Sequence, residues 1–210
     1  PTTLMAITEE ANDYYFPPFT GTYLRLSRML ITLMSLLVTP LFLLFMEHPQ
    51  WIPGSFSFIA IEDPIHLPLI WQFLMLELSI DGLRLAAIHT PDVLSTPLSV
   101  IAGLSIGEFS VESGWFNSEV LLYMAFVTIA NYSQINMELN YALKFMRILL
   151  LLLTNWFGLI GFILGLLGIF FSLLTCRTFS GKGYLYPFIP FDWKLLKRSL
   201  FRMKLKEPGN

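Results

Sequence analysis

Two long stretches without a charged residue set the first limit on what this chain can fold into. Met29–Met46 holds 18 uncharged residues and Ile148–Thr175 holds 28. A helix rises about 1.5 Å per residue, so about 20 apolar residues cross the hydrocarbon core of a bilayer. Hydrophobic residues make up 55% of the 210 residues and charged residues only 13%, against about 25% in soluble domains. The sequence therefore predicts an all-α integral membrane protein.

The apolar segments of the chain predict about four transmembrane helices plus one short re-entrant or partial helix. The segments are Met29–Met46, Leu67–Ile88, Ile101–Gly114, Glu119–Ala130 and Ile148–Thr175. The third is short, rich in small residues and preceded by Pro97, and the fourth is too short to span well alone. Either of these two can be the partial helix. The fifth is longer than a bilayer needs, so we expect a tilted or protruding helix.

Basic residues are concentrated near the C-terminus. Eight of the 13 Lys and Arg residues follow Cys176, and Arg25 and Arg28 precede the first apolar run, whereas 47–63 contains no Lys or Arg. The positive-inside rule therefore places both flanks in the cytoplasm. The stretch KLLKRSLFRMKLK either binds anionic lipid headgroups as an amphipathic helix or serves only as a topology signal. The expected organisation is a polar N-terminal segment 1–22, a helical membrane domain 23–176 and a basic cytoplasmic tail 177–210.

The third segment, IAGLSIGEFSVESG with the residues just before it, has two different faces if it is helical. At about 100° per residue, small residues share one side, namely Ser99, Gly103, Gly107 and Ser110. The opposite side changes from apolar to acidic in the order Leu98, Ile101, Ser105, Glu108 and Glu112. The small-residue face is expected to pack closely against another helix.

The acidic face of the third segment supports two interpretations. If several copies surround an axis, Leu98 and Ile101 can form a hydrophobic constriction, while Glu108 and Glu112 form an acidic ring that attracts cations. Ser105 then lies between these two levels of the pore. Alternatively, both acids have emerged into headgroups or water, and the apolar part of the face meets lipid or a neighbouring helix.

Glycines also form a stripe along the fifth segment. The members are Gly158, Gly161, Gly165 and Gly168, spaced by three, four and three residues. This spacing keeps them on one helix face and includes a GxxxG match, which favours close helix packing over pore lining.

Three charged residues lie within the second apolar segment. Glu77, Asp81 and Arg84 share one helix face at spacings of four and three. Charges at membrane depth are costly unless they pair or reach water. Either Asp81 and Arg84 lie at the cytoplasmic end and extend to the interface, or Arg84 pairs with an acid of another helix, such as Glu108.

The sequence does not predict an enzyme. Cys176 is the single cysteine, and the histidines His48, His66 and His89 are isolated from one another. Neither a HExxH nor a Walker pattern is present. We expect no cofactor, no metal site and no nucleic-acid partner.

Several motifs in this order are similar to one known family. They are NDYYFPPFTGTYLRLSR, LMLELSIDGLRLAAIHTP, PLSVIAGLSIGEFSVESGW, IANYSQINMELNYALKFMRILLLL and FGLIGFILGLLGIFFSLLTCRTFSGKGYLYPFIPFD. The chain resembles, over essentially its whole length, the membrane domain of the A subunit family of spore germinant receptors (the GerA type). Glu108 replaces a glutamine usual in the family, and DGLRLAAI departs from a Glu-rich pattern. Both departures favour the stage V sporulation AF branch.

The resemblance implies a germination protein of the inner spore membrane. It implies an oligomer, five copies in this family, that releases monovalent cations together with other germination membrane proteins. The family has a large soluble N-terminal domain that is absent here, so we expect the chain to be part of a longer protein. Two other classes stay open, namely a non-conducting scaffold subunit and a secondary transporter. The sequence has no internal repeat, which places the transporter last.

Overall fold

The computed structural model describes residues 15–61, 63–89, 97, 100–134, 136–176, 184 and 193. This part of the chain forms helices and no strand, which confirms the predicted all-α class. The elements are α2 (Pro18–Glu47), the 3₁₀ helices η2 (Pro49–Trp51) and η3 (Gly54–Ile59), α3 (Leu69–His89), the π-helical η4 (Leu104–Phe109), α5 (Ser110–Glu112), α6 (Ser118–Tyr132) and α7 (Met137–Thr175). The predictions for 1–14 and for most of the tail lie outside the described residues.

Helix α2 contains the first predicted span and begins eleven residues before it. Pro17 caps the helix and Pro18 is its first residue, a position that suits proline because the first N–H of a helix has no intrahelical partner. Pro40 lies inside α2 without ending it. Proline has no N–H, so the carbonyl one turn earlier loses its hydrogen bond, and a bundle of membrane helices tolerates this loss.

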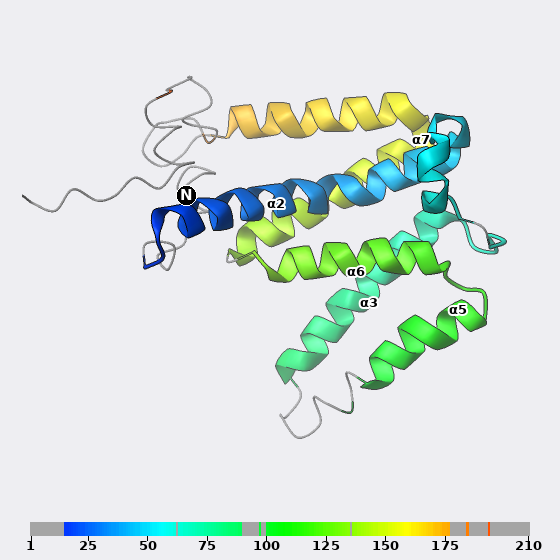
Figure 1. Ribbon diagram of the computed structural model, residues 1–210. Coiled ribbons are helices and arrows are strands. Elements are labelled where there is room, and N and C mark those ends of the chain that lie inside the picture. Colours follow the sequence, from blue (N-terminus) through cyan, green and yellow to red (C-terminus); the bar gives the residue numbers. More distant parts are fainter. Residues whose placement is uncertain are drawn as a thin grey trace, which may run out of the picture.

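The core lies where α2, α3, α6 and α7 meet. Its buried side chains are Phe42, Leu43, Leu69, Ile70, Phe73, Leu76, Val120, Met124 and Leu151. Phe42 meets Phe73 edge to face, with ring centroids 6.1 Å apart. Helix α2 makes its most extensive contacts with α7 and then with α6, and the three lie side by side in Figure 1.

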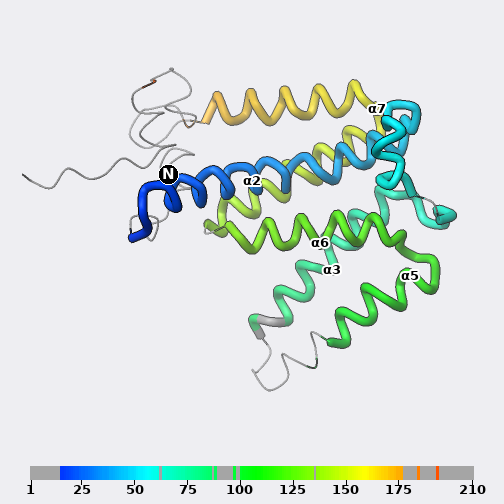
Figure 2. The backbone as a smooth tube through the Cα atoms, viewed as in Figure 1, coloured from blue at the N-terminus to red at the C-terminus, as the bar shows by residue number. Residues whose placement is uncertain are grey.

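The fifth apolar segment is not one helix. Gly158 has φ +56° and ψ −135°, and it separates two helical arms, 137–157 and 159–175, within α7. The second arm folds back toward the end of the molecule where α2 begins (Figure 2). The prediction of a single tilted span is therefore wrong, because glycine allows a sharp turn here that a residue with a Cβ atom does not readily make. The expected count of four transmembrane helices is not confirmed.

Gly161 and Gly165 allow the two arms of α7 to approach closely. A Cβ atom on Gly161 would lie 1.9 Å from the carbonyl oxygen of Leu153, and one on Gly165 would lie 2.5 Å from Leu150 Cδ1. Gly161 and Gly165 of the glycine stripe thus face the preceding arm of the same helix. Gly168 has no atom within 4 Å of a Cβ position, and Gly158 lies at the turn.

Helices α2 and α7 are both long and apolar enough to cross a membrane. Only 39% of the most apolar window of α2 and 22% of that of α7 are buried within the chain. A core helix of a soluble protein would be mostly buried, so the exposed apolar surface favours a membrane environment.

Candidate functional site

A cluster of four charged side chains, three of them buried, joins α2, α3 and the first arm of α7. Its members are Glu77, Asp81, Lys144 and Arg147. Arg147 is fully buried, and Glu77 and Lys144 are exposed by only 4% and 8%. Glu77 and Asp81 are four residues apart on α3, and Lys144 and Arg147 are three apart on α7, so each pair presents both charges on one helix face.

The hydrogen bonds of the charge cluster cross between helices. Arg147 Nε donates to Glu77 Oε1 at 2.7 Å, and Arg147 Nη2 lies 2.5 Å from the same oxygen. Arg147 Nη1 donates to the Ser35 carbonyl of α2 at 3.0 Å. Lys144 Nζ donates to the Glu77 carbonyl at 3.2 Å and pairs with the Asp81 carboxylate. Each buried cation therefore has an anion beside it, which offsets the cost of removing both from water.

Lys144 and Arg147 were not predicted from the sequence, although Glu77 and Asp81 were placed on one helix face. The sequence does contain a signal for these partners. Two acids four residues apart on α3 share one helix face, and two bases three residues apart on α7 also share one face, so the two faces can pair. Charges are rare at membrane depth and usually pair with one another. Matching the two sets identifies the partners.

Arg84 does not join this cluster. Its guanidinium carbon lies 4.9 Å from the ring centroid of Tyr132 and 5.8 Å from that of Tyr141. The pairing of Arg84 with Glu108, one of the two alternatives, is not present, since Glu108 is exposed and the rings of Tyr132 and Tyr141 lie beside the guanidinium. Cation–π contacts of this kind also favour Arg over Lys.

The third segment, described over residues 100–112, exposes the acidic face. Ile101 is 62% exposed, and Ser105, Glu108 and Glu112 are exposed as well. Ser110 on the other face is buried. Leu98 and Ser99 lie outside the described residues. The rest of the chain therefore leaves the predicted pore face uncovered, and Gly103 on the small-residue face is exposed as well.

The central turn of the third segment is a π-helix, Leu104–Phe109, which contains Ser105, Gly107 and Glu108. Such turns are rare and often mark functional sites, because they shift the side chains that follow relative to those before. This turn was not predicted from the sequence, because the two faces were assigned with a uniform α-helical spacing of about 100° per residue.

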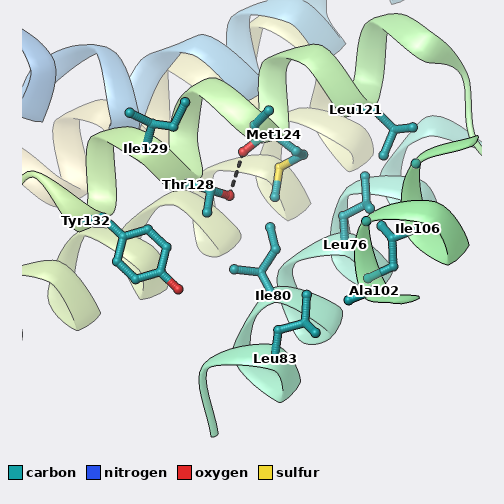
Figure 3. Close-up of a pocket in the computed structure, with 13 residues that line it drawn as sticks. Leu76, Ile80, Leu83, Ala102, Ile106, Leu121, Met124, Thr128, Ile129 and Tyr132 are labelled. Atoms are coloured by element: carbon teal, nitrogen blue, oxygen red, sulfur yellow. Dashed lines mark hydrogen bonds between the residues drawn. The ribbon is translucent and has the colours of Figure 1, made fainter. Parts of the chain in front are cut away.

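A pocket of about 570 Å³ separates the third segment from α3 and α6 (Figure 3). The lining residues are Leu76, Ile80, Leu83, Ala102, Gly103, Ile106, Gly107, Leu121, Met124, Ala125, Thr128, Ile129 and Tyr132. Gly103 and Gly107 face this space, and a Cβ atom on either would meet no atom within 4 Å. The small-residue face thus borders a pocket within the single chain, where close packing was predicted.

A second polar bridge fixes the opposite end of α3. Gln72 and Asn117 are both buried, and Gln72 Nε2 donates to Asn117 Oδ1 at 2.8 Å. The Asn117 N–H donates back to Gln72 Oε1 at 2.9 Å. The bridge ties the start of α3 to the residue that caps α6. In the described parts of the chain, no group of three or more His, Cys, Asp or Glu residues is placed to hold a metal ion.

Comparison with known proteins gives a consistent family assignment. The family model described as Bacillus/Clostridium GerA spore germination protein matches residues 1–208. The chain is 35% identical over 202 residues to stage V sporulation protein AF of Bacillus subtilis (strain 168), covering 96% of this chain and 41% of that protein. It is 24% identical over 206 residues to spore germination protein KA of the same strain, covering 97% and 38%.

A third relative has a name that refers to the membrane. The chain is 25% identical over 194 residues to the uncharacterized membrane protein YfkQ of Bacillus subtilis (strain 168), covering 91% of this chain and 38% of that protein. The chain thus spans about two fifths of the length of these relatives. No solved structure gives a significant match.

The long, exposed apolar helices favour a helical bundle in a membrane, and the charge cluster lies in the interior of this bundle. The chain belongs to the GerA family of spore germination proteins, as its motifs indicated.

Proposed function

We propose that this chain is a membrane subunit of a spore germination complex and that copies of it surround a pore for monovalent cations. The pore would contain five copies, release ions from the inner spore membrane during germination, and act with other germination membrane proteins. Both termini of the membrane domain would face the cytoplasm, and the basic tail would contact anionic headgroups. The sporulation and germination proteins among the relatives support the setting.

The observation that carries the proposal is the uncovered face of the third segment. The exposure of Ile101 beside Glu108 and Glu112 adds no stability to a single chain. A ring of copies would turn these residues toward a common axis. Apolar constrictions and acidic rings are the elements that gate cation channels and set their selectivity. The π-helical turn gives the segment a place at which to change register when the pore opens.

The test is cation flux through liposomes that contain the purified chain. We expect K⁺ and Na⁺ to cross and a raised resting leak in Ile101→Ala, because the constriction loses its side chain. Val100→Ala is the matched control, since Val100 is the adjacent residue and is similarly exposed, at 55% against 62%. If Val100→Ala and Ile101→Ala leak equally, the assignment of Ile101 to the gate is wrong.

A non-conducting scaffold subunit is the second candidate, and the second arm of α7 favours it. This arm exposes several large apolar side chains, namely Leu159, Ile160, Ile163, Leu164, Leu167, Phe170 and Phe171. Such a surface suits contact with another membrane protein as well as with lipid. Liposomes that contain the chain at any density and conduct no cation would support the scaffold.

A further inference from the structure

The pocket beside the third segment has apolar walls with two polar side chains among them. These are Thr128 and Tyr132, and the Thr128 hydroxyl donates to the Met124 carbonyl at 2.7 Å. The middle of the pocket therefore offers a hydrocarbon surface, and its volume falls in the range of about 300–1,000 Å³ that small-molecule sites occupy. Its walls suit an alkyl chain.

One end of the pocket lies beside a cation. Figure 3 shows Tyr132 at the opposite end of the lining from Leu121. The Tyr132 ring contacts the guanidinium of Arg84, and the Tyr141 ring contacts the same guanidinium. Arg84 is half-buried, and in the described parts of the chain no carboxylate forms an ion pair with it. The positive charge is therefore free to meet an anion.

This end of the pocket coincides with one end of the helix bundle. Helix α3 ends at His89 and α6 ends at Tyr132, at the end of the bundle where α2 starts (Figure 1). Tyrosines are enriched at the membrane–water interface. Basic pockets between transmembrane helices on the cytoplasmic side bind anionic lipid headgroups.

We propose that this pocket binds an anionic phospholipid, with one acyl chain between α3, α6 and the third segment and the phosphate at Arg84. The site is separate from the basic tail and does not depend on ion conduction. A bound chain fills the space that Gly103 and Gly107 leave open, and it thereby links the third segment to the bundle. A lipid in this place influences how far the third segment can move.

The experiment uses phosphatidylglycerol with a photoreactive diazirine in its acyl chain, mixed with the purified chain in detergent. After illumination, mass spectrometry locates the labelled peptides. We expect label on α3 and α6 at Leu83 and Met124, competed by unlabelled phosphatidylglycerol and much less by phosphatidylcholine. Glycerol 3-phosphate carries the same anion without the chain and should not compete. Arg84→Gln should remove the preference for the anionic lipid.

Gly107→Leu places a side chain in the pocket, since Gly107 lines it and a Cβ atom there meets nothing within 4 Å. It should lower labelling of the pocket by about tenfold, equivalent to about 1.4 kcal/mol. Gly82→Leu is the control, since Gly82 lies on α3 with equal space but outside the lining. If a thermal melt shows that Gly107→Leu is not folded, Gly103→Leu is used in its place.

Three results would overturn the proposal. One is equal competition by phosphatidylcholine and phosphatidylglycerol. Another is pocket labelling that survives both glycine substitutions in folded protein. The third is cross-linking of a cysteine at Leu83 to a second copy of the chain, which would show that a neighbouring subunit occupies the pocket.

Discussion

The guanidinium of Arg147 is fully buried and donates a 2.7 Å hydrogen bond to the carboxylate of Glu77, which is only 4% exposed. The pair joins α7 to α3, and the bond from Arg147 to the Ser35 carbonyl adds α2. Removing one partner of a buried pair leaves the other charge without compensation, which costs more than the pair itself contributes. The charge cluster is therefore the point at which three helices depend on one another.

Arg147→Met should destabilise the bundle by about 3–5 kcal/mol, because Glu77 is then left as a buried anion beside Lys144 alone. Chemical unfolding in detergent, followed by circular dichroism, measures the change. Replacing Glu77 with Met in the same chain should restore much of the stability, since no orphan charge then remains at this position. A double variant as unstable as the single one would argue against the pair as the cause.

Asp81→Asn should cost much less, about 1 kcal/mol or below, although Asp81 belongs to the same cluster. The Asp81 side chain is 34% exposed, so water screens its attraction to Lys144. Lys144 also keeps its contacts with Glu77. The same unfolding measurement compares Asp81→Asn with Arg147→Met, and equal losses would show that exposure does not control the energetics here.

Gly158→Ala should destabilise the hairpin of α7 by about 1–3 kcal/mol, because a Cβ atom is strained at this backbone conformation. Space is not the limitation, since the nearest atoms to the added Cβ lie 3.7 Å away. Gly168→Ala is the matched control. It lies inside the second arm with free space around it, so alanine should leave stability unchanged or raise it by up to about 1 kcal/mol. Equal effects would contradict the sharp turn.

Gln72→Leu should cost about 1–3 kcal/mol, because the buried N–H of Asn117 loses its acceptor. Ser79→Ala provides the comparison, as Ser79 is half-buried and donates only to the Met75 carbonyl of its own helix. Hydrogen exchange of the Asn117 amide gives a direct local measurement. Exchange in Gln72→Leu that is as slow as in the parent would exclude the bridge.

The sequence was sufficient to predict that the chain is helical, because hydropathy and periodicity act locally. The turn at Gly158 was not predictable in this way. Four glycines at helical spacing look alike in sequence, and only the fold assigns one of them to a turn and two to the contact between arms. The partners of Glu77 also depend on long-range packing, since Arg147 lies 70 residues further along the chain.

The central claim is that the acids of the third segment influence cation passage, and ion selectivity in planar bilayers tests it most directly. Glu108→Gln removes an exposed carboxylate inside the third segment. Glu138→Gln, the control, removes an exposed carboxylate outside it. We expect Glu108→Gln to reduce the preference for K⁺ over Cl⁻, seen as a shift of the reversal potential in a KCl gradient, while Glu138→Gln leaves it at the parental value. Identical reversal potentials in the parent and in both variants would contradict the claim.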